Sequence, residues 1–141
     1  MPFEASSAAV ANPTSGRRLF TLAEANKALP YVRRIVADIR EVYQEAVDLQ
    51  QRLQEPELPA EQGDEAYDRI MGRLNQLVDE LHDVGVELKD YELGLIDFPA
   101  IHDGREVYLC WKLGEPEVLA WHEVDAGFAG RQKVDTLDPP A

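Results

Sequence analysis

The stretch VYLCWKLGEPEVLAWHEV, residues 107–124, contains both tryptophans, the only cysteine and one of the three histidines of the chain. On either side of its centre, apolar and polar residues alternate, which is typical of β-strands. The central segment Leu113-Gly114-Glu115-Pro116 has the composition of a turn, since glycine and proline interrupt strands. The stretch therefore predicts a β-hairpin with strands over residues 105–112 and 117–124.

A third strand precedes this hairpin. Residues 95–101 show the same alternation, and His102-Asp103-Gly104 has the composition of a tight turn. The three strands are therefore expected to form an antiparallel meander. A two-residue turn at the centre of the second hairpin places Glu106 directly opposite Glu123, and directly paired residues share one face of a sheet.

This pairing assigns every strand residue to one of two faces. The first face is almost wholly apolar, and we expect it to pack on the helices; its members are Ile96, Phe98, Ala100, Val107, Leu109, Trp111, Val118, Ala120, His122 and Val124. The second face is predicted to point outward. It gathers carboxylates, aromatic rings and the cysteine, in the set Asp97, Pro99, Ile101, Glu106, Tyr108, Cys110, Leu119, Trp121 and Glu123.

Two apolar seams ahead of the strands predict a helical hairpin. Thr21 and Glu24 have the spacing of a capping box, which predicts a short helix over residues 22–28. Proline cannot continue that helix without losing a hydrogen bond, so we expect a longer helix to begin at Pro30. Its seam is Val32, Ile35, Ile39, Val42, Ala46, Leu49 and Leu53. The same spacing returns, after a break at residues 55–59, in Tyr67, Ile70, Leu74, Leu77, Leu81, Val84 and Leu88. Two matched seams predict antiparallel helices packed as in a coiled coil.

The pattern as a whole predicts an α+β fold with a single domain over residues 19–132. In this fold, a long antiparallel helical hairpin, preceded by a short helix, packs against a three-stranded antiparallel β-meander. Residues 1–18 and 133–141 lack hydrophobic periodicity, so we expect flexible tails. A chain of 141 residues fits one domain of this kind.

The composition argues against several classes of partner. The formal net charge is −13, from 27 acidic and 14 basic residues, so nucleic acids and anionic membranes are not expected partners. No apolar run approaches the roughly 20 residues that span a bilayer. The start of the chain carries no readable secretory signal, and we therefore expect a cytoplasmic protein. A single cysteine excludes an internal disulfide.

A pair of carboxylates on the outward face is a candidate site. Glu106 and Glu123 face each other in the predicted register, and adjacent carboxylates are unfavourable unless an arginine, a shared proton or a cation compensates them. Arg105 and Arg131 are the arginines near this face in the sequence. The pair is therefore interpreted either as part of a structural ion pair or as the ligands of a divalent metal.

The other polar residues of these strands are candidates for binding a ligand or a partner. Cys110, His122 and Glu123 resemble zinc ligands in the linear sequence, but the predicted register separates Cys110 from His122, so we do not expect them to hold one ion. A glycine-containing loop ends at Arg131, which either pairs with a carboxylate or binds a small anion. The candidate surface comprises Asp97, Tyr108, Cys110, Trp121, His122, Asp125 and Arg131.

Several motifs resemble a known family. They are FTLAEAN at residues 20–26, VELKD at 86–90, GLIDFP at 94–99, GREVYLCW at 104–111, LGEP at 113–116, WHE at 121–123 and GFAGR at 127–131. In this order they are similar to the prokaryotic family called domain of unknown function 2203, over about residues 19–132. The resemblance implies a small bacterial cytoplasmic protein. It implies no activity, cofactor or catalytic residue.

Two classes of function fit these observations. The first is a protein–protein interaction or self-association module, most simply a homodimer, that uses the outward face of the sheet. The second is a small ligand- or divalent-cation-binding protein, or an enzyme, that uses the clustered carboxylates. We find no catalytic motif, phosphate-binding glycine motif or metal signature, so the catalytic residues and any cofactor are unknown from the sequence.

Overall fold

A computed structural model describes residues 18–54 and 60–137 of the chain. The predicted break at residues 55–59 and most of the two predicted tails, residues 1–17 and 138–141, lie outside the described residues. Within the described part, neither helix combines the length and the apolar character that a membrane-spanning helix requires.

The described chain forms two compact units, and each is considered by itself. The sheet unit comprises residues 18–29, 97–111 and 115–137, and the helical unit comprises residues 30–54, 60–96 and 112–114. The prediction of one domain stays a prediction.

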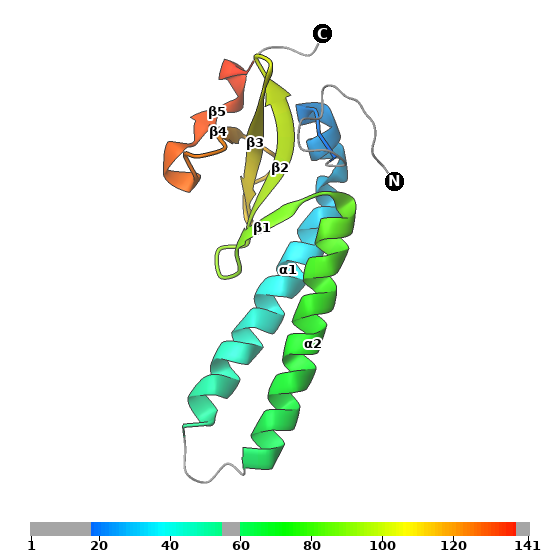
Figure 1. Ribbon diagram of the computed structural model, residues 1–141, viewed down its shortest axis with the longest axis vertical. Helices are drawn as coiled ribbons and strands as arrows, with labels where there is room; N and C mark the ends of the chain where they lie inside the picture. The colour runs from blue at the N-terminus through cyan, green and yellow to red at the C-terminus, as the bar shows by residue number, and fades with distance from the viewer. Residues whose placement is uncertain (1–17, 55–59, 138–141) are drawn as a thin grey trace. The chain divides into compact units, whose positions relative to one another are not determined.

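The fold is α+β, as the sequence predicts, with two helices and an antiparallel sheet (Figure 1). The elements are α1 (Leu22–Arg52), α2 (Ala60–Val84), β1 (Glu87–Asp90), β2 (Leu95–His102), β3 (Arg105–Lys112), β4 (Ala120–Glu123), the 3-10 turn η2 (Phe128–Gly130), β5 (Gln132–Lys133) and the 3-10 turn η3 (Val134–Thr136). The sheet has five strands in the order β1-β2-β3-β4-β5 rather than the three expected.

The first helix is continuous, which corrects the prediction of two helices separated at Pro30. The capping box is present, since Thr21 N donates to Glu24 Oε1 at 2.9 Å and Glu24 N donates to Thr21 Oγ1 at 3.0 Å. Pro30 lies inside α1 and removes one backbone donor there. Buried side chains on both sides of it, Leu29 and Val32, anchor the helix through this position.

The second helix ends earlier than the apolar seam predicts. Gly85 has a φ of +98° and its N–H donates to the His82 carbonyl at 2.9 Å, while Val86 N donates to the Leu81 carbonyl at 3.2 Å. This pair of bonds is a Schellman cap, which glycine favours because it accepts positive φ without strain. Leu88, predicted as the last helical seam residue, therefore lies in β1.

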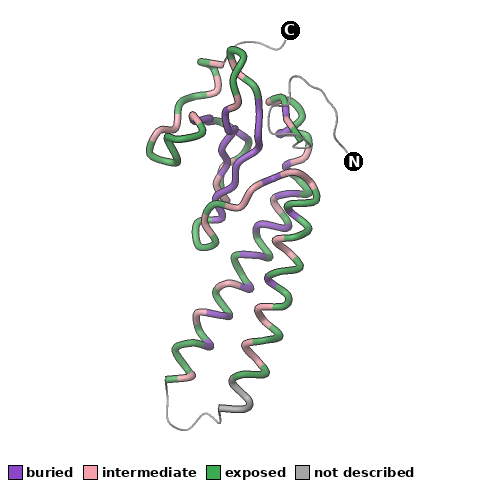
Figure 2. The backbone as a smooth tube through the Cα atoms, in the orientation of Figure 1, coloured by how far each residue is buried: buried purple, intermediate pink, exposed green. Residues whose placement is uncertain are grey.

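The helical unit is an antiparallel pair formed by α2 and the part of α1 that follows Pro30, and Figure 1 shows the two side by side. Tyr31 near the start of this part of α1 donates a hydrogen bond to Glu80 near the end of α2 at 2.7 Å, which fixes the antiparallel direction. Figure 2 shows buried residues recurring along α1. The buried seam of the pair comprises Val32, Ile35, Val36, Ile39, Val42, Ala46, Leu49, Leu74 and Leu81.

Gly94 is a position at which a side chain cannot be accommodated. Its φ is +66°, and an added Cβ would lie 2.8 Å from Leu113 Cβ and 3.0 Å from Val36 Cγ1. We expect Gly94→Ala to lower the free energy of unfolding by about 2–3 kcal/mol, because it combines a left-handed backbone with overpacking. Urea denaturation followed by far-UV circular dichroism measures this change. Gly72→Ala is the matched control: no atom lies within 4 Å of its Cβ position, so the helix is expected to gain about 1 kcal/mol. A Gly94→Ala variant as stable as the wild type would contradict the close approach.

The strands confirm part of the predicted meander. β2 and β3 match the predicted strands over residues 95–101 and 105–112. β1 and β5 were not predicted, and Lys133, predicted to begin the C-terminal tail, pairs with Ala120. β4 begins only at Ala120, so the connection from β3 spans residues 113–119 instead of a two-residue turn.

The long connection changes the register of β3 and β4. Val107 pairs with Glu123 and Tyr108 pairs with His122, so the predicted pairing of Glu106 with Glu123 is wrong by one residue. A shift of one residue turns each side chain of β4 to the other face of the sheet. Within the connection, Val118 N donates to the Asn26 side-chain oxygen at 2.7 Å, and this bond joins residues 92 positions apart.

Candidate functional site

The observed register brings together three side chains that the predicted register separates. Tyr108 is opposite His122 and Cys110 is opposite Ala120, so Cys110 and His122 lie on one face of the β3–β4 pair. Asp97 of β2 joins them. One ligand atom from each of Asp97, Cys110 and His122 lies within 4.8 Å of the other two. The sheet therefore forms a three-residue cluster, which we call the Asp–Cys–His cluster.

The Asp–Cys–His cluster lies in the interior of the sheet unit. Asp97 is 1% exposed, Cys110 is fully buried and His122 is 3% exposed. Figure 2 shows a continuous buried run along β2 and β3. Buried ionisable side chains need a partner, because the loss of solvation is costly for each of them. The contacts of His122 show how two of these side chains are satisfied.

The hydrogen bonds of His122 determine where its ring protons lie. Nδ1 is 2.7 Å from the Glu123 carbonyl oxygen, which can only accept, so we infer that Nδ1 carries a proton. Nε2 is 3.0 Å from both Asp97 carboxylate oxygens. An ionised carboxylate also only accepts, so a second positive centre is required between Nε2 and Asp97. This centre is either a proton, shared between the imidazole and the carboxyl group, or a metal ion.

The thiol of Cys110 is protonated when no metal is present. Burial raises the pKa of Cys110 to about 12, and the negative charge of Asp97 contributes in the same direction. The positive charge of Arg131 opposes this shift in the pKa of Cys110, and its Nη2 also donates to the Cys110 carbonyl oxygen at 3.4 Å. The guanidinium of Arg131 also donates to Glu115 Oε1 at 2.8 Å.

Native Cys110 is expected to react slowly with thiol reagents. Because the thiolate is the reactive form, raising the pKa from 9.0 to about 12 lowers its population about 1000-fold at mildly alkaline pH. We therefore expect iodoacetamide to modify the chelator-treated native protein at least about 1000-fold more slowly than the urea-unfolded chain. Mass spectrometry of timed samples measures both rates. Rates within tenfold of each other would show that the thiol is neither buried nor suppressed.

The predicted pairing of Glu106 with Glu123 does not occur in the sheet. Glu123 shares its face with Val107, and the register therefore turns Glu106 to the opposite face. Arg105 binds the Glu123 carboxylate through Nε, at 2.9 Å, and through Nη2. This bidentate contact lowers the pKa of Glu123 and raises that of Arg105. The sequence allowed either a structural ion pair or a metal site at Glu123, and the structure shows an ion pair with Arg105.

Two of the other predicted surface residues lie beside the cluster, since the Tyr108 ring is 5.5 Å from the His122 ring and Arg131 contacts the Cys110 carbonyl oxygen. Tyr108 and Trp121 are 6% and 3% exposed, so they do not form an outward surface. Trp121 donates through Nε1 to Thr136 Oγ1 at 2.8 Å, and residues after β4 thus cover this part of the sheet. Asp125 lies in the exposed loop that follows β4. Arg131 lies over the Phe128 ring, 4.9 Å from its centroid, and pairs with Glu115.

The donor set of the cluster is chemically selective. A thiolate sulfur and an imidazole nitrogen favour zinc and other late transition metals, whereas Mg²⁺ and Ca²⁺ favour sites made of oxygen ligands. The bond from His122 Nδ1 to a backbone carbonyl is the contact that typically orients a metal-binding imidazole and directs Nε2 at the ion. Each of the three residues was a candidate in the sequence. Only the length of the connection between β3 and β4 prevented their joint assignment.

Comparisons with known proteins identify the family. Neither the curated proteins nor the solved structures yielded a match to this chain. The family model described as "Uncharacterized conserved protein (DUF2203)" matches residues 18–134, which is most of the chain. The motifs noted in the sequence lie within this range. The chain belongs to the DUF2203 family.

Proposed function

We propose that this protein binds a divalent transition-metal ion, with Zn²⁺ as the preferred ion, through Asp97, Cys110 and His122. The observation that carries the proposal is the convergence of one ligand atom from each of the three buried side chains, within 4.8 Å of the other two, around the position between His122 Nε2 and Asp97 that requires a positive centre. A metal ion meets this requirement and also accepts the sulfur of Cys110. Protein sites with three ligands of this kind leave one position of a tetrahedral ion for water or another ligand.

The position of the ligands suggests what the ion does. Asp97, Cys110 and His122 come from β2, β3 and β4, three consecutive strands of the sheet, and all three are buried. An ion held by these residues would tie the central strands together, and its binding free energy would add to the stability of the folded state. A free thiol ligand is compatible with the cytoplasm, which we propose as the location of the protein.

Titration with Co²⁺ and Zn²⁺ tests this proposal. We expect the chelator-treated full-length protein to bind one Co²⁺ with a thiolate-to-cobalt charge-transfer absorption, which Zn²⁺ then removes by displacement. Zn²⁺ should release about two protons per ion, one from His122 Nε2 and one from the Cys110 thiol, as measured in weakly buffered solution.

Variants separate this site from adventitious binding. Cys110→Ser should remove the charge-transfer band, and His122→Phe should weaken Zn²⁺ binding at least about 100-fold. His102→Phe is the matched control, because it removes an imidazole of β2 that is not part of the cluster. Glu106→Gln is expected to bind Zn²⁺ normally. The proposal fails if the wild type binds no Zn²⁺, or if His122→Phe and the wild type bind it equally.

We also propose self-association, because of a specific set of exposed side chains in the sheet unit. Ile101, Leu119, Val124 and Phe128 are each between 42% and 52% exposed, and covering them with a second copy of the chain would remove apolar surface from water. These residues replace Tyr108 and Trp121 as the candidate contact with a second copy of the chain or another protein. Light scattering of the full chain should show a dimer, and Leu119→Asp should shift it to monomer. Gln132→Asp adds the same charge at an exposed residue of β5 and should remain dimeric. A monomeric wild type would reject self-association.

A further inference from the structure

The sheet unit contains a pocket that is separate from the Asp–Cys–His cluster. Its volume is about 650 Å³, which lies in the range of small-molecule sites. The walls come from the start of α1 and the residues before it, from the end of β2 and the following turn, from β3 and from residues 134–137. The pocket is open to solvent on one side, so a ligand can enter it without a change in the fold.

Local contacts fix the walls of the pocket. Phe20 N donates to the Pro99 carbonyl at 2.7 Å, and the Phe20 ring packs edge-on against Phe98 at 5.1 Å between centroids. On another wall, Val134 N donates to the Leu119 carbonyl at 3.0 Å. Backbone hydrogen bonds therefore hold two of the wall segments in place before any ligand binds. Binding to a preformed site costs less conformational entropy, because the residues of the site are already ordered.

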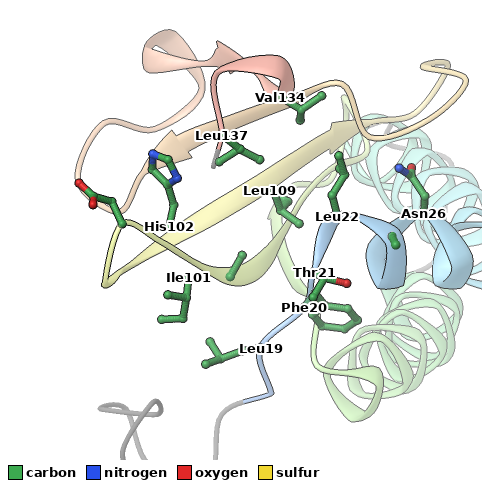
Figure 3. Close-up of a pocket in the computed structure, with 13 residues that line it drawn as sticks. Leu19, Phe20, Thr21, Leu22, Asn26, Ile101, His102, Leu109, Val134 and Leu137 are labelled. Atoms are coloured by element: carbon green, nitrogen blue, oxygen red, sulfur yellow. The ribbon is translucent and has the colours of Figure 1, made fainter. Parts of the chain in front are cut away.

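The lining of the pocket is apolar in the middle and polar at two ends. Figure 3 shows Leu22 and Leu109 between Asn26 on one side and His102 on the other. The Asn26 side-chain oxygen accepts the bond from Val118 N, so this amide offers its NH₂ group to a ligand. At the other end, Asp103 lines the pocket beside His102.

Charges of both signs border the pocket, since Arg18 lies over the Phe20 ring, 4.3 Å from its centroid, and Asp103 lines one end of the pocket. Asp103 carries a negative charge. Arg105 compensates this charge weakly, because its Nη1 lies 3.4 Å from Asp103 Oδ2 at the surface. Arg105 is at the same time engaged with Glu123. The chain as a whole carries a net charge of −13, so an anionic ligand would approach against the electrostatic potential. A molecule with an apolar body, an acceptor toward Asn26 and no negative charge matches the lining.

We propose that this pocket binds uncharged or cationic aromatic small molecules. The site is independent of the proposed metal site, since its lining includes neither Asp97, Cys110 nor His122. The apolar side chains receive the aromatic body, and the amide of Asn26 and the carboxylate of Asp103 orient its polar groups.

Two dyes with one carbon skeleton provide the test. N-phenyl-1-naphthylamine is uncharged, and 8-anilino-1-naphthalenesulfonate is closely similar in shape but carries a sulfonate. We expect the full-length protein to bind the uncharged dye saturably at one site, and the sulfonate at least about tenfold more weakly at low ionic strength. Asp103→Asn should reduce this difference at least about threefold. Because the His102 ring lies 4.9 Å from the Trp121 ring, the bound dye should also quench the fluorescence of Trp121.

A filled pocket is the decisive variant. Ala23 lines the pocket at an exposed position of α1, so Ala23→Phe should fill it and weaken binding of the uncharged dye at least about tenfold without unfolding the helix. Ala37→Phe makes the same change at an exposed position of α1 outside the pocket and should bind like the wild type. If circular dichroism shows that Ala23→Phe is unfolded, Ile101→Phe on β2 takes its place, since Ile101 lines the pocket and is 42% exposed. Absence of saturable binding, equal affinities for the two dyes, or unchanged binding in the folded filling variant would overturn the proposal.

Discussion

Replacing Asp97 by alanine is expected to lower the free energy of unfolding of the metal-free protein by about 3 kcal/mol. The carboxylate is 1% exposed and both of its oxygens lie 3.0 Å from His122 Nε2. Removing one member of a buried ion pair leaves the other charge without compensation, which typically costs 3–5 kcal/mol. We place the effect at the lower end because an imidazole can lose its proton. Urea denaturation of chelator-treated protein measures the loss.

A double variant distinguishes the ion pair from simple cavity formation. Asp97→Leu combined with His122→Phe replaces both charges by apolar side chains, and we expect it to recover most of the stability lost in Asp97→Ala, since buried pairs contribute little beyond an apolar equivalent. The same double variant should bind no Zn²⁺. An Asp97→Ala variant that loses less than about 1 kcal/mol would show that Asp97 and His122 are not a buried charged pair.

Replacing Trp111 by alanine is expected to lower the free energy of unfolding by about 3–5 kcal/mol. Trp111 is fully buried in the sheet unit and is the largest of its completely buried side chains. Its indole Nε1 also donates to the Glu115 carbonyl at 2.9 Å. The substitution therefore leaves a cavity and removes the donor that holds the start of the connection between β3 and β4.

Far-UV circular dichroism during urea denaturation measures this effect without relying on tryptophan fluorescence. Trp111→Phe serves as the control, because it keeps an aromatic ring and removes the N–H donor; a smaller loss of about 1–2 kcal/mol is expected. A loss below about 1 kcal/mol for Trp111→Ala would contradict the burial of this side chain.

The sequence predicts those elements whose cause is local. The alternation of residues along β2 and β3 and the capping box at Thr21 are visible in short windows, and the structure confirms all three. β1 and β5 were missed because four and two residues are too few to show a period. The apolar seam that continues to Leu88 places Gly85 inside the second helix, although glycine at a helix end commonly forms a cap, as it does here.

The prediction of the candidate site was wrong in one respect, the length of the connection between β3 and β4. A two-residue turn at Gly114 and Glu115 sends Cys110 and His122 to opposite faces, whereas the observed seven-residue connection over residues 113–119 sends them to the same face. Val118 in this connection is hydrogen-bonded to Asn26, which is 92 positions away in the sequence. A pattern in a short window of sequence cannot predict such a contact. The sequence therefore identifies Asp97, Cys110 and His122 as separate candidates but does not predict that they form one cluster.

The bond between Asn26 and Val118 has a consequence for the newly made chain. At a synthesis rate of about 5–20 residues per second, the 92 positions that separate the two residues correspond to roughly 5–20 s on the ribosome. During this interval Asn26, in the first turns of α1, cannot form its hydrogen bond, because Val118 has not yet been translated. The sheet unit therefore cannot be completed before Val118 has emerged from the exit tunnel.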